Sequence, residues 1–422
     1  MTIRRSFWVV IAVLAGAIFG AITARSEIYS RLVYFCVGLM IFCLIWSRLS
    51  IRGILVRRKG KGLRQQLGQV FEERYEIENQ FKTPRFLIEI KDGADLPIPT
   101  GSRFISWIEP REIRKYSGYS LLTQRGEFHL GPTIISSGDP FGLFGIQKVV
   151  AEGERLVVLP YLVNIHHFPF PPGFLPGGRA LRRKTHEVTP HAAGVREYST
   201  GDSLNRIHWA STARRDQLMV KEFEQDPQSD VWIFLDGYSK SHYRRPLEVE
   251  GGKVDKIWLW RHRFEITLPI DTFEYAVSAA ASIANYFIHD DQAVGLACAG
   301  QALSILPAEK GVRQLDKILE TLAFLRCVGK LPLRGLVQAQ VQHIQRGSTV
   351  VLITASDHEG VVYAAQTLMA KNLRPVIVLI DPASFGGKTS VKDFALSLRD
   401  KNFPVILISH GEDLGLALQR SL

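Results

Sequence analysis

Charged side chains of both signs alternate around two aromatic residues between residues 196 and 224. The residues of this stretch that can bind a partner are Arg196, Glu197, Tyr198, Gly201, Asp202, Arg206, Trp209 and Arg214, followed by Glu222. Because arginine binds carboxylates through two parallel hydrogen bonds, the arginines can pair with Glu197, Asp202 or Glu222, with Trp209 as an anchor. The pattern predicts either a polar network that clamps two domains together or a docking surface. No nucleophile stands beside a base, so the pattern does not indicate covalent catalysis.

The elements that follow this stretch predict an α/β domain over residues 230–422. Short apolar runs rich in β-branched residues occur at 231–235, 293–297, 349–353, 375–380 and 404–408. Segments with helical periodicity occur at 272–289, 313–325, 333–345, 361–371 and 391–401. Alternating buried strands and helices are typical of a mainly parallel sheet. Ligands of such sheets bind at the carboxyl ends of the strands, near a switch in strand order.

A different pattern precedes the charged stretch. From residue 69 to about 160, short alternating runs are broken by turn residues such as Asp92-Gly93 and Ser137-Gly138-Asp139-Pro140. This spacing predicts a small antiparallel β-sandwich with no catalytic motif. Residues 161–229 are then expected to comprise a Pro/Gly-rich linker followed by the charged stretch.

Two uncharged apolar runs, 7–24 and 32–47, precede the β-rich segment. Each approaches the roughly 20 residues that a helix needs to cross a membrane. Residues 1–64 are therefore expected to form a transmembrane hairpin and a basic juxtamembrane segment, with a signal peptide as the alternative for the first run. Positive charge gathers before the first run, at Arg4 and Arg5, and after the second, from Arg48 to Arg64. The positive-inside rule then places both ends, and the bulk of the chain, on the cytoplasmic side of the plasma (inner) membrane.

Composition excludes several classes of protein. The chain has 422 residues and a net charge of +11. Much of that excess lies next to the second apolar run, where it either contacts anionic headgroups or only stops translocation. We therefore expect membrane lipid, and no nucleic acid, as a partner. The four cysteines form no C-x-x-C pair, which argues against a zinc module or a disulfide scaffold.

The charged stretch resembles the signature of the family called domain of unknown function 58. The motifs that carry the resemblance are, in order, Arg196-Glu197-Tyr198, Gly201-Asp202, Arg206-Ile207-His208-Trp209, Ala213-Arg214 and Lys221-Glu222-Phe223-Glu224. Residues 124–132 and 138–144 resemble the β-domain of that family, and residues 230–422 resemble its von Willebrand factor type A-like domain. Proteins of this kind are often associated with MoxR-type AAA+ ATPases, so the resemblance implies a role in complex assembly at the membrane.

The resemblance to type A domains also implies a possible metal-binding site. Such domains typically hold Mg²⁺ with D-x-S-x-S after the first strand, a Thr from a second loop and an Asp from a third. Here the first strand is followed by Asp236, Ser239 and Ser241, but two residues instead of one separate Asp236 from Ser239. The acid Asp357 follows a central strand. The second loop, residues 328–331, supplies no hydroxyl. We expect a degenerate site, with no certain cofactor and Mg²⁺ as the one candidate.

An insertion at residues 247–269 separates the first α/β strand from its helix. It carries Trp258 and Trp260 among basic residues. Tryptophans among cations at the carboxyl end of a strand predict a lid packed on the domain, a partner contact or insertion among lipid headgroups.

These patterns favour a membrane-anchored scaffold rather than an enzyme. The function we expect is that of an adaptor for a MoxR-type AAA+ ATPase in complex assembly or in metal or cofactor maturation. The region of Asp236 and Asp357 and the Trp258/Trp260 insertion would form the contact surface. The alternative is a Mg²⁺-dependent hydrolase at the degenerate site, against which the missing oxygen ligand of the second loop counts.

Overall fold

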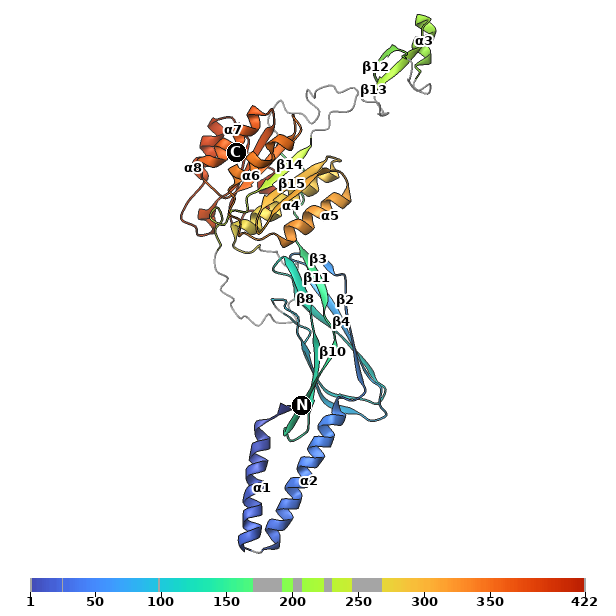
Figure 1. Ribbon diagram of the computed structural model, residues 1–422, viewed down its shortest axis with the longest axis vertical. Coiled ribbons are helices and arrows are strands. Elements are labelled where there is room, and N and C mark those ends of the chain that lie inside the picture. Colours follow the sequence, from blue (N-terminus) through green and yellow to red (C-terminus); the bar gives the residue numbers. More distant parts are fainter. Residues whose placement is uncertain are drawn as a thin grey trace. The chain divides into compact units, whose positions relative to one another are not determined.

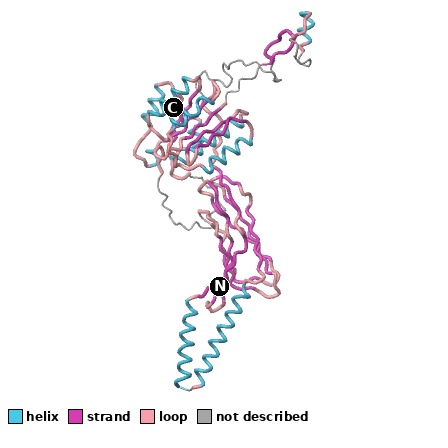
Figure 2. Tube along the Cα trace, in the orientation of Figure 1, coloured by secondary structure: helices cyan, strands magenta, loops and turns pink. Residues whose placement is uncertain are grey.

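The computed structural model describes residues 2–24, 26–97, 99–169, 192–199, 207–223, 230–244 and 268–420. The chain divides into two compact units, Met1–Leu159 and Pro160–Glu250 together with Leu268–Leu422. Helices begin the first unit and strands make up the rest of it, whereas the second unit contains both (Figure 2).

Two apolar helices, α1 (Arg5–Ala24) and α2 (Glu27–Ser50), begin the first unit and contact each other along a hairpin (Figure 1). Their mean hydropathy is 2.2 and 2.1, and few of their residues are buried. At about 1.5 Å per residue, each is long enough to cross a bilayer. By length and composition, both helices could therefore span a membrane. The short strand β1 (Thr2–Ile3) precedes α1 and pairs with β10 (Phe144–Ala151).

Strands make up the rest of this unit and form three sheets, with the orders β1-β10-β9-β5-β6, β2-β4-β7 and β3-β11-β8. The remaining strands are β2 (Ile54–Gly60), β3 (Arg64–Gln66), β4 (Val70–Asn79), β5 (Arg85–Asp92), β6 (Arg103–Ile108), β7 (Ile113–Leu121), β8 (Gly126–Leu130), β9 (Thr133–Gly138) and β11 (Glu154–Leu159). The pairs are antiparallel except β3 with β11. The first two sheets share one core, to which β2 contributes Ile54 and Val56 and β5 contributes Ile88 and Ile90. The antiparallel sheets expected from the alternating pattern are present.

Strand β2 covers residues that we expected in a basic juxtamembrane segment. It pairs with β4 from Ile54 opposite Asn79 to Gly60 opposite Glu73. Alternation explains the difference, because Ile54 and Val56 face the core while Arg57 points to solvent. The arginine-rich run therefore belongs to the sheet.

A buried ion group lies inside the strand region. The Nη2 atom of Arg58 is 2.6 Å from Oε1 of Glu73 and 2.9 Å from Oδ1 of Asp92, and these side chains are at most 5% exposed. Arg58 also lies over the ring of Tyr75, 5.4 Å from its centroid. Burial raises the pKa of Glu73, because one guanidinium faces two carboxylates away from water.

A small hairpin precedes the α/β part of the second unit in sequence. Strand β12 (Ala192–Glu197) pairs antiparallel with β13 (Met219–Phe223), and helix α3 (Trp209–Arg215) lies between them in sequence. The side chain of His208 caps α3 by accepting from the Ser211 amide.

A six-stranded sheet with the order β16-β15-β14-β17-β18-β19 forms the α/β part. Its strands are β14 (Val231–Leu235), β15 (Val294–Ala299), β16 (Leu303–Glu309), β17 (Thr349–Thr354), β18 (Arg374–Ile380) and β19 (Val405–Ile408). The helices are α4 (Thr272–His289), α5 (Val312–Phe324), α6 (Leu333–Gln340), α7 (Glu359–Ala370), α8 (Lys392–Asp400) and α9 (Leu414–Leu418). Every pair is parallel except β15 with β16, so the mainly parallel sheet is confirmed and β16 is an added antiparallel edge.

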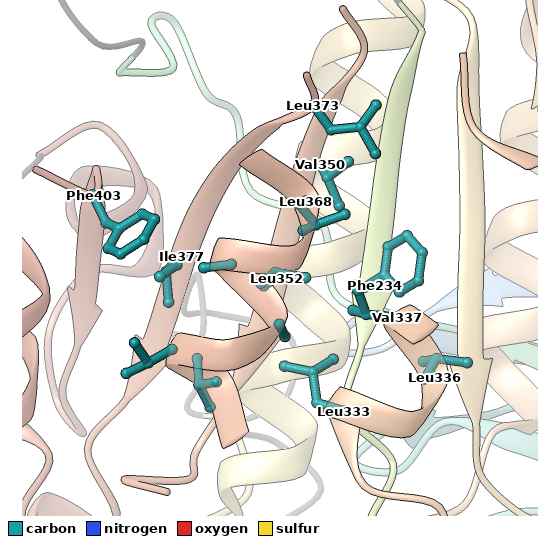
Figure 3. Packing of buried hydrophobic residues seen from close by; sticks show 14 of the residues in the cluster. Phe234, Leu333, Leu336, Val337, Val350, Leu352, Leu368, Leu373, Ile377 and Phe403 are labelled. Atoms are coloured by element: carbon teal, nitrogen blue, oxygen red, sulfur yellow. The ribbon is translucent and has the colours of Figure 1, made fainter. Parts of the chain in front are cut away.

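One face of this sheet packs against α6, α7 and α8. Phe234, Leu352 and Ile377 point from the sheet toward Leu336 and Leu368 of the helices (Figure 3). Side chains of a strand alternate between the two faces of the sheet, so the neighbours of these residues, such as Ile233, point to the opposite face. That face is also buried, and helix α4 contacts it. Burial on both faces explains why the strands are continuously apolar.

Candidate functional site

Strand order reverses where β14 and β17 lie side by side. Leu235 of β14 is paired with Ile353 of β17 at their carboxyl ends. From β14 the chain passes through α4 to β15 on one side, while β17 and β18 follow on the other. Ligands of open α/β sheets bind at such a reversal. Asp236 and Thr354 are the polar residues that this position brings together.

Asp236 is buried, with 2% of its surface exposed. Its Oδ2 atom accepts a hydrogen bond of 2.7 Å from the Thr354 hydroxyl. Its Oδ1 atom accepts one of 3.0 Å from the backbone amide of Tyr238. Both carboxyl oxygens therefore accept hydrogen bonds from the protein itself, as buried polar atoms generally do.

His242 links the loop after β14 to the start of α4. Its Nε2 atom lies 2.8 Å from the carbonyl oxygen of Asp236, to which it must donate. Its Nδ1 atom lies 3.2 Å from the hydroxyl of Thr272, the first residue of α4. Burial lowers the pKa of His242, so the ring is neutral near pH 7. In this arrangement the histidine fastens the loop and presents no free nitrogen.

The second loop, residues 328–331, forms backbone hydrogen bonds with the first loop, which follows β14. Gly329 donates to the Gly237 carbonyl at 3.0 Å, and Ser239 donates back to the Gly329 carbonyl at 3.1 Å. A Cβ at Gly329 would lie 2.1 Å from the carbonyl oxygen of Ala299, and one at Gly237 would lie 2.4 Å from the same atom. The backbone segments of Gly237, Ala299 and Gly329 are therefore too close to leave room for a side chain. At this point the second loop presents backbone atoms and no side-chain hydroxyl that could bind a metal ion.

The expected metal ligands do not form a ready site for Mg²⁺. Asp236 is occupied by Thr354 and Tyr238, while Ser239 and Asp357 are exposed and Ser241 is half-buried. Within the described residues, no three His, Cys, Asp or Glu side chains gather in a way that could hold a metal ion. Mg²⁺ needs near-octahedral oxygen ligands. Of the four expected ligands, Asp236 is the one that the structure buries, and its oxygens already accept hydrogen bonds from Thr354 and Tyr238.

Thr354 is the polar neighbour of Asp236 that we did not anticipate. We expected Asp357 to face Asp236, because it is the acid that follows the central strand. The pairing of β14 with β17 instead puts the last residue of β17 next to Asp236. A hydroxyl residue at the end of an otherwise apolar strand was the available signal.

The charged stretch presents some of its predicted residues on the β12–α3–β13 hairpin. Arg196 donates to the carbonyl oxygen of Glu197 at 2.9 Å and lies opposite Val220 in the strand pair. The backbone amide of Tyr198 donates to Leu218 at 2.8 Å. Gly201, Asp202, Arg206, Trp258 and Trp260 lie outside the described residues.

Trp209, which we expected to anchor a contact, is 68% exposed. It is the first residue of α3, and Arg214 and Arg215 at the other end of that helix are also exposed. Leu218, between α3 and β13, is 44% exposed. Aromatic, apolar and arginine side chains on one short hairpin are typical of a protein-binding surface.

The strand region contains a cavity that we did not expect from the sequence. Its volume is about 310 Å³, and strands β6 and β7 line it with Arg103, Phe104, Ile105, Ser106, Trp107, Arg114, Lys115 and Tyr116. Arg103 lies 5.1 Å from the ring centroid of Tyr116. Both strands are the last in their sheets, so the cavity opens between two sheet edges.

Comparisons with known proteins find a family and a relative that resemble this chain. Residues 194–249, which contain most of the hairpin, strand β14 and Asp236, match the family described as "Protein of unknown function DUF58". The chain is 25% identical over 249 residues to "Uncharacterized protein YeaD" of Bacillus subtilis (strain 168), covering 57% of this chain and 54% of the relative. It thus spans about half the length of that curated relative.

A comparison with solved structures finds a cycloisomaltooligosaccharide glucanotransferase from Paenibacillus sp. complexed with cycloisomaltoheptaose. The identity is 10%, the coverage is 84% of this chain and 52% of that chain, and the TM-score is 0.17, which is too low to carry an argument. The family match and the distant homologue agree with each other. Together they support the DUF58 family for this chain.

Proposed function

We propose that the protein is a membrane-anchored adaptor that docks a MoxR-type AAA+ ATPase during complex assembly or metal or cofactor maturation. The observation that carries the proposal is the exposure of Trp209, 68%, within the segment that matches the family. Tryptophan is highly buried in most proteins, and interface hot spots are enriched in tryptophan and arginine. Trp209 with Arg214 and Arg215 is therefore the contact that we assign to the partner.

The carboxyl edge of the α/β sheet supports binding rather than catalysis. Each carboxylate oxygen of Asp236 accepts a hydrogen bond, from Thr354 or Tyr238, and both ring nitrogens of His242 lie within hydrogen-bond distance of the loop and of α4. A general base needs a free lone pair directed at a substrate. The site's polar groups instead hold the loops at this edge in one conformation, as a docking surface requires, and this agrees with the von Willebrand factor type A-like domain that we propose.

The two apolar helices supply the anchor in this proposal. Basic residues gather at the end of the helix pair from which the strands continue, with Arg4 and Arg5 at the start of α1 and Arg48 and Arg52 in and just after the last turn of α2. At the opposite end of the helix pair, the sequence has only Arg25 and Arg31 against Glu27. By the positive-inside rule, the strand region and the second unit lie in the cytoplasm and the turn between the helices lies outside.

A pull-down from the protein's own cells tests the adaptor role. Tagged full-length protein is solubilised in detergent with Mg²⁺ and a slowly hydrolysed ATP analogue, beside the variants Trp209→Ser and Val312→Ser. Val312 is a matched control, since it is 69% exposed at the start of another helix outside the family match. We expect wild type and Val312→Ser to recover a MoxR-type AAA+ ATPase, identified by mass spectrometry, and Trp209→Ser to lose most of it.

Two outcomes would count against this proposal. Equal recovery by all three proteins would remove Trp209 from the contact, and Trp258→Ser/Trp260→Ser would then be the variant to compare. Absence of any AAA+ ATPase from the wild-type sample would contradict the adaptor role itself.

A further inference from the structure

One end of the strand region is built around the ends of α1 and α2. The turns 51–53, 80–84, 109–112 and 139–143 meet there, because β2 starts with Ile54 opposite Asn79 and β6 ends with Ile108 opposite Arg85. The N-terminal strand β1 pairs with the start of β10 at the same end (Figure 1). We call these four turns the helix-proximal end.

Hydrogen bonds hold the turns of the helix-proximal end to one another and to the segment that directly follows α2. The Asn79 side-chain amide donates to the carbonyl oxygens of Thr83, at 2.9 Å, and Glu109, at 3.0 Å. Arg85 donates to the carbonyl oxygen of Arg52, just after α2, at 3.1 Å. The turns are therefore held at one level relative to the end of α2, and their exposed side chains form a preorganised surface.

The turn between β9 and β10 reaches beside the apolar part of the helices. Leu143 and Phe144 pack in one cluster with Cys43 of α2, and Phe7, Val10, Leu39 and Leu44 border that cluster. Cys43 precedes the end of α2 by about 10 Å at 1.5 Å per residue. The Asp139 carboxylate accepts hydrogen bonds from the backbone amides of Phe141 and Leu143, which fix the conformation of this turn. The Phe141 side chain is nevertheless 58% exposed.

Further aromatic side chains lie at this level. Trp107 is 51% exposed and packs edge-on against Phe86, which in turn stacks on Trp46 in the last turns of α2. Phe81 is 39% exposed in the neighbouring turn. Tryptophan and other aromatic residues concentrate at the boundary between lipid tails and headgroups.

The charge of this end is positive. Its exposed basic residues, with those at the helix ends, are Arg4, Arg5, Arg48, Arg52, Lys82 and Arg111. Its acids are Glu109, Glu112 and the buried Asp139, and Glu112 is already paired with Arg114. Anionic headgroups are the complement of such a surface.

We propose that the helix-proximal end is a lipid-binding surface: Phe81, Trp107 and Phe141 insert at the headgroup level, and the surrounding basic side chains bind anionic lipid headgroups. The proposal rests on the two-helix anchor proposed above. It adds that the strand region contacts the bilayer surface directly and is not connected to the membrane through the helices alone. The bilayer then limits the tilt of the strand region.

Fluorescence quenching in nanodiscs tests this surface. The full-length chain is made with an encoded environment-sensitive fluorophore at Phe141 or at Glu152, which lies in the turn at the far end of β10 and serves as the matched control. Each protein is placed in nanodiscs that carry headgroup spin-labelled lipid, either in phosphatidylcholine alone or with half phosphatidylglycerol. We expect quenching at least several-fold stronger at 141 than at 152, and stronger with phosphatidylglycerol. The variant Arg52→Gln/Lys82→Gln/Arg111→Gln should lose the dependence on phosphatidylglycerol.

The outcomes separate this proposal from the anchor. Equal and weak quenching at 141 and 152, in a chain that resists carbonate extraction, would overturn the lipid-binding surface and leave the anchor standing. Strong quenching at 141 that ignores phosphatidylglycerol would overturn the assignment to anionic lipid. A chain that carbonate extracts from membranes would contradict the anchor itself.

Discussion

The hydroxyl of Thr354 donates a 2.7 Å hydrogen bond to Oδ2 of Asp236, across the neighbouring carboxyl ends of β14 and β17. This bond joins two segments that are 118 residues apart in the chain. It also occupies the one buried carboxylate at the point where strand order reverses. The stability of the α/β part and the availability of Asp236 to any ligand therefore depend on the same contact.

Replacing Thr354 with Val should destabilise the protein by about 1–3 kcal/mol, because a buried carboxylate oxygen loses its donor. Thermal unfolding of the detergent-purified full-length chain measures the loss. Thr354→Ser is the control, since it keeps the hydroxyl and should retain most of the stability. Equal destabilisation by Val and Ser would show that the methyl group, and not the hydrogen bond, carries the effect.

The buried Arg58 should matter far more than its neighbour Arg57. Arg58→Met leaves Glu73 and Asp92 facing each other without a cation, at a cost of about 3–5 kcal/mol. Arg57→Met removes a side chain that is 61% exposed and 3.9 Å from Glu78, so it should cost under about 1 kcal/mol. Denaturant unfolding of both variants compares them directly. A similar midpoint for the two would argue against the buried ion group.

Glu73 should make the stability of the protein fall as the pH rises. Burial raises its pKa in the folded chain above the ordinary 4.5, so the folded state binds the proton more tightly than the unfolded state. Its contribution is fully present below pH 4.5 and is lost as the pH rises through the folded pKa. Glu73→Gln should flatten this decline in melting temperatures measured from pH 4.5 upward.

Glu76→Gln is the control for that experiment. Hydrogen bonding to Lys115 lowers the pKa of Glu76, so its contribution has the opposite sign and is lost as the pH falls. Its removal should not flatten the decline. If Glu73→Gln and wild type have the same pH dependence, Glu73 does not bind its proton more tightly in the fold.

Gly329 should tolerate no side chain. A Cβ there would lie 2.1 Å from the carbonyl oxygen of Ala299 and 2.6 Å from that of Gly237, so Gly329→Ala must push backbone segments apart. We expect a loss of about 1–3 kcal/mol in the free energy of unfolding. Gly360→Ala, in α7, meets only Arg334 at 3.8 Å and should leave stability unchanged or raise it by up to about 1 kcal/mol. Unfolding curves of the two variants should therefore move in different directions or by clearly different amounts.

Local patterns in the sequence were enough to place many of the elements. Helix α4 spans Thr272–His289 and strand β14 spans Val231–Leu235, which are the bounds that periodicity and composition predicted. Both are largely buried, strand β14 is continuously apolar, and the end of β14 and the start of α4 are marked by Asp236 and by the capping residue Asp271. The two apolar N-terminal helices followed from hydropathy alone.

Only the tertiary structure decided which distant residues meet. The sequence alone determined that an acid follows β14 and that hydroxyls and another acid follow β17, but strand register chose Thr354 over Asp357 as the partner of Asp236. It also decided that residues 54–60 join a sheet, that Arg58 is buried and that Trp209 is exposed. The reason is physical: period and propensity act over a few residues, whereas pairing, burial and exposure depend on contacts between segments far apart in the chain.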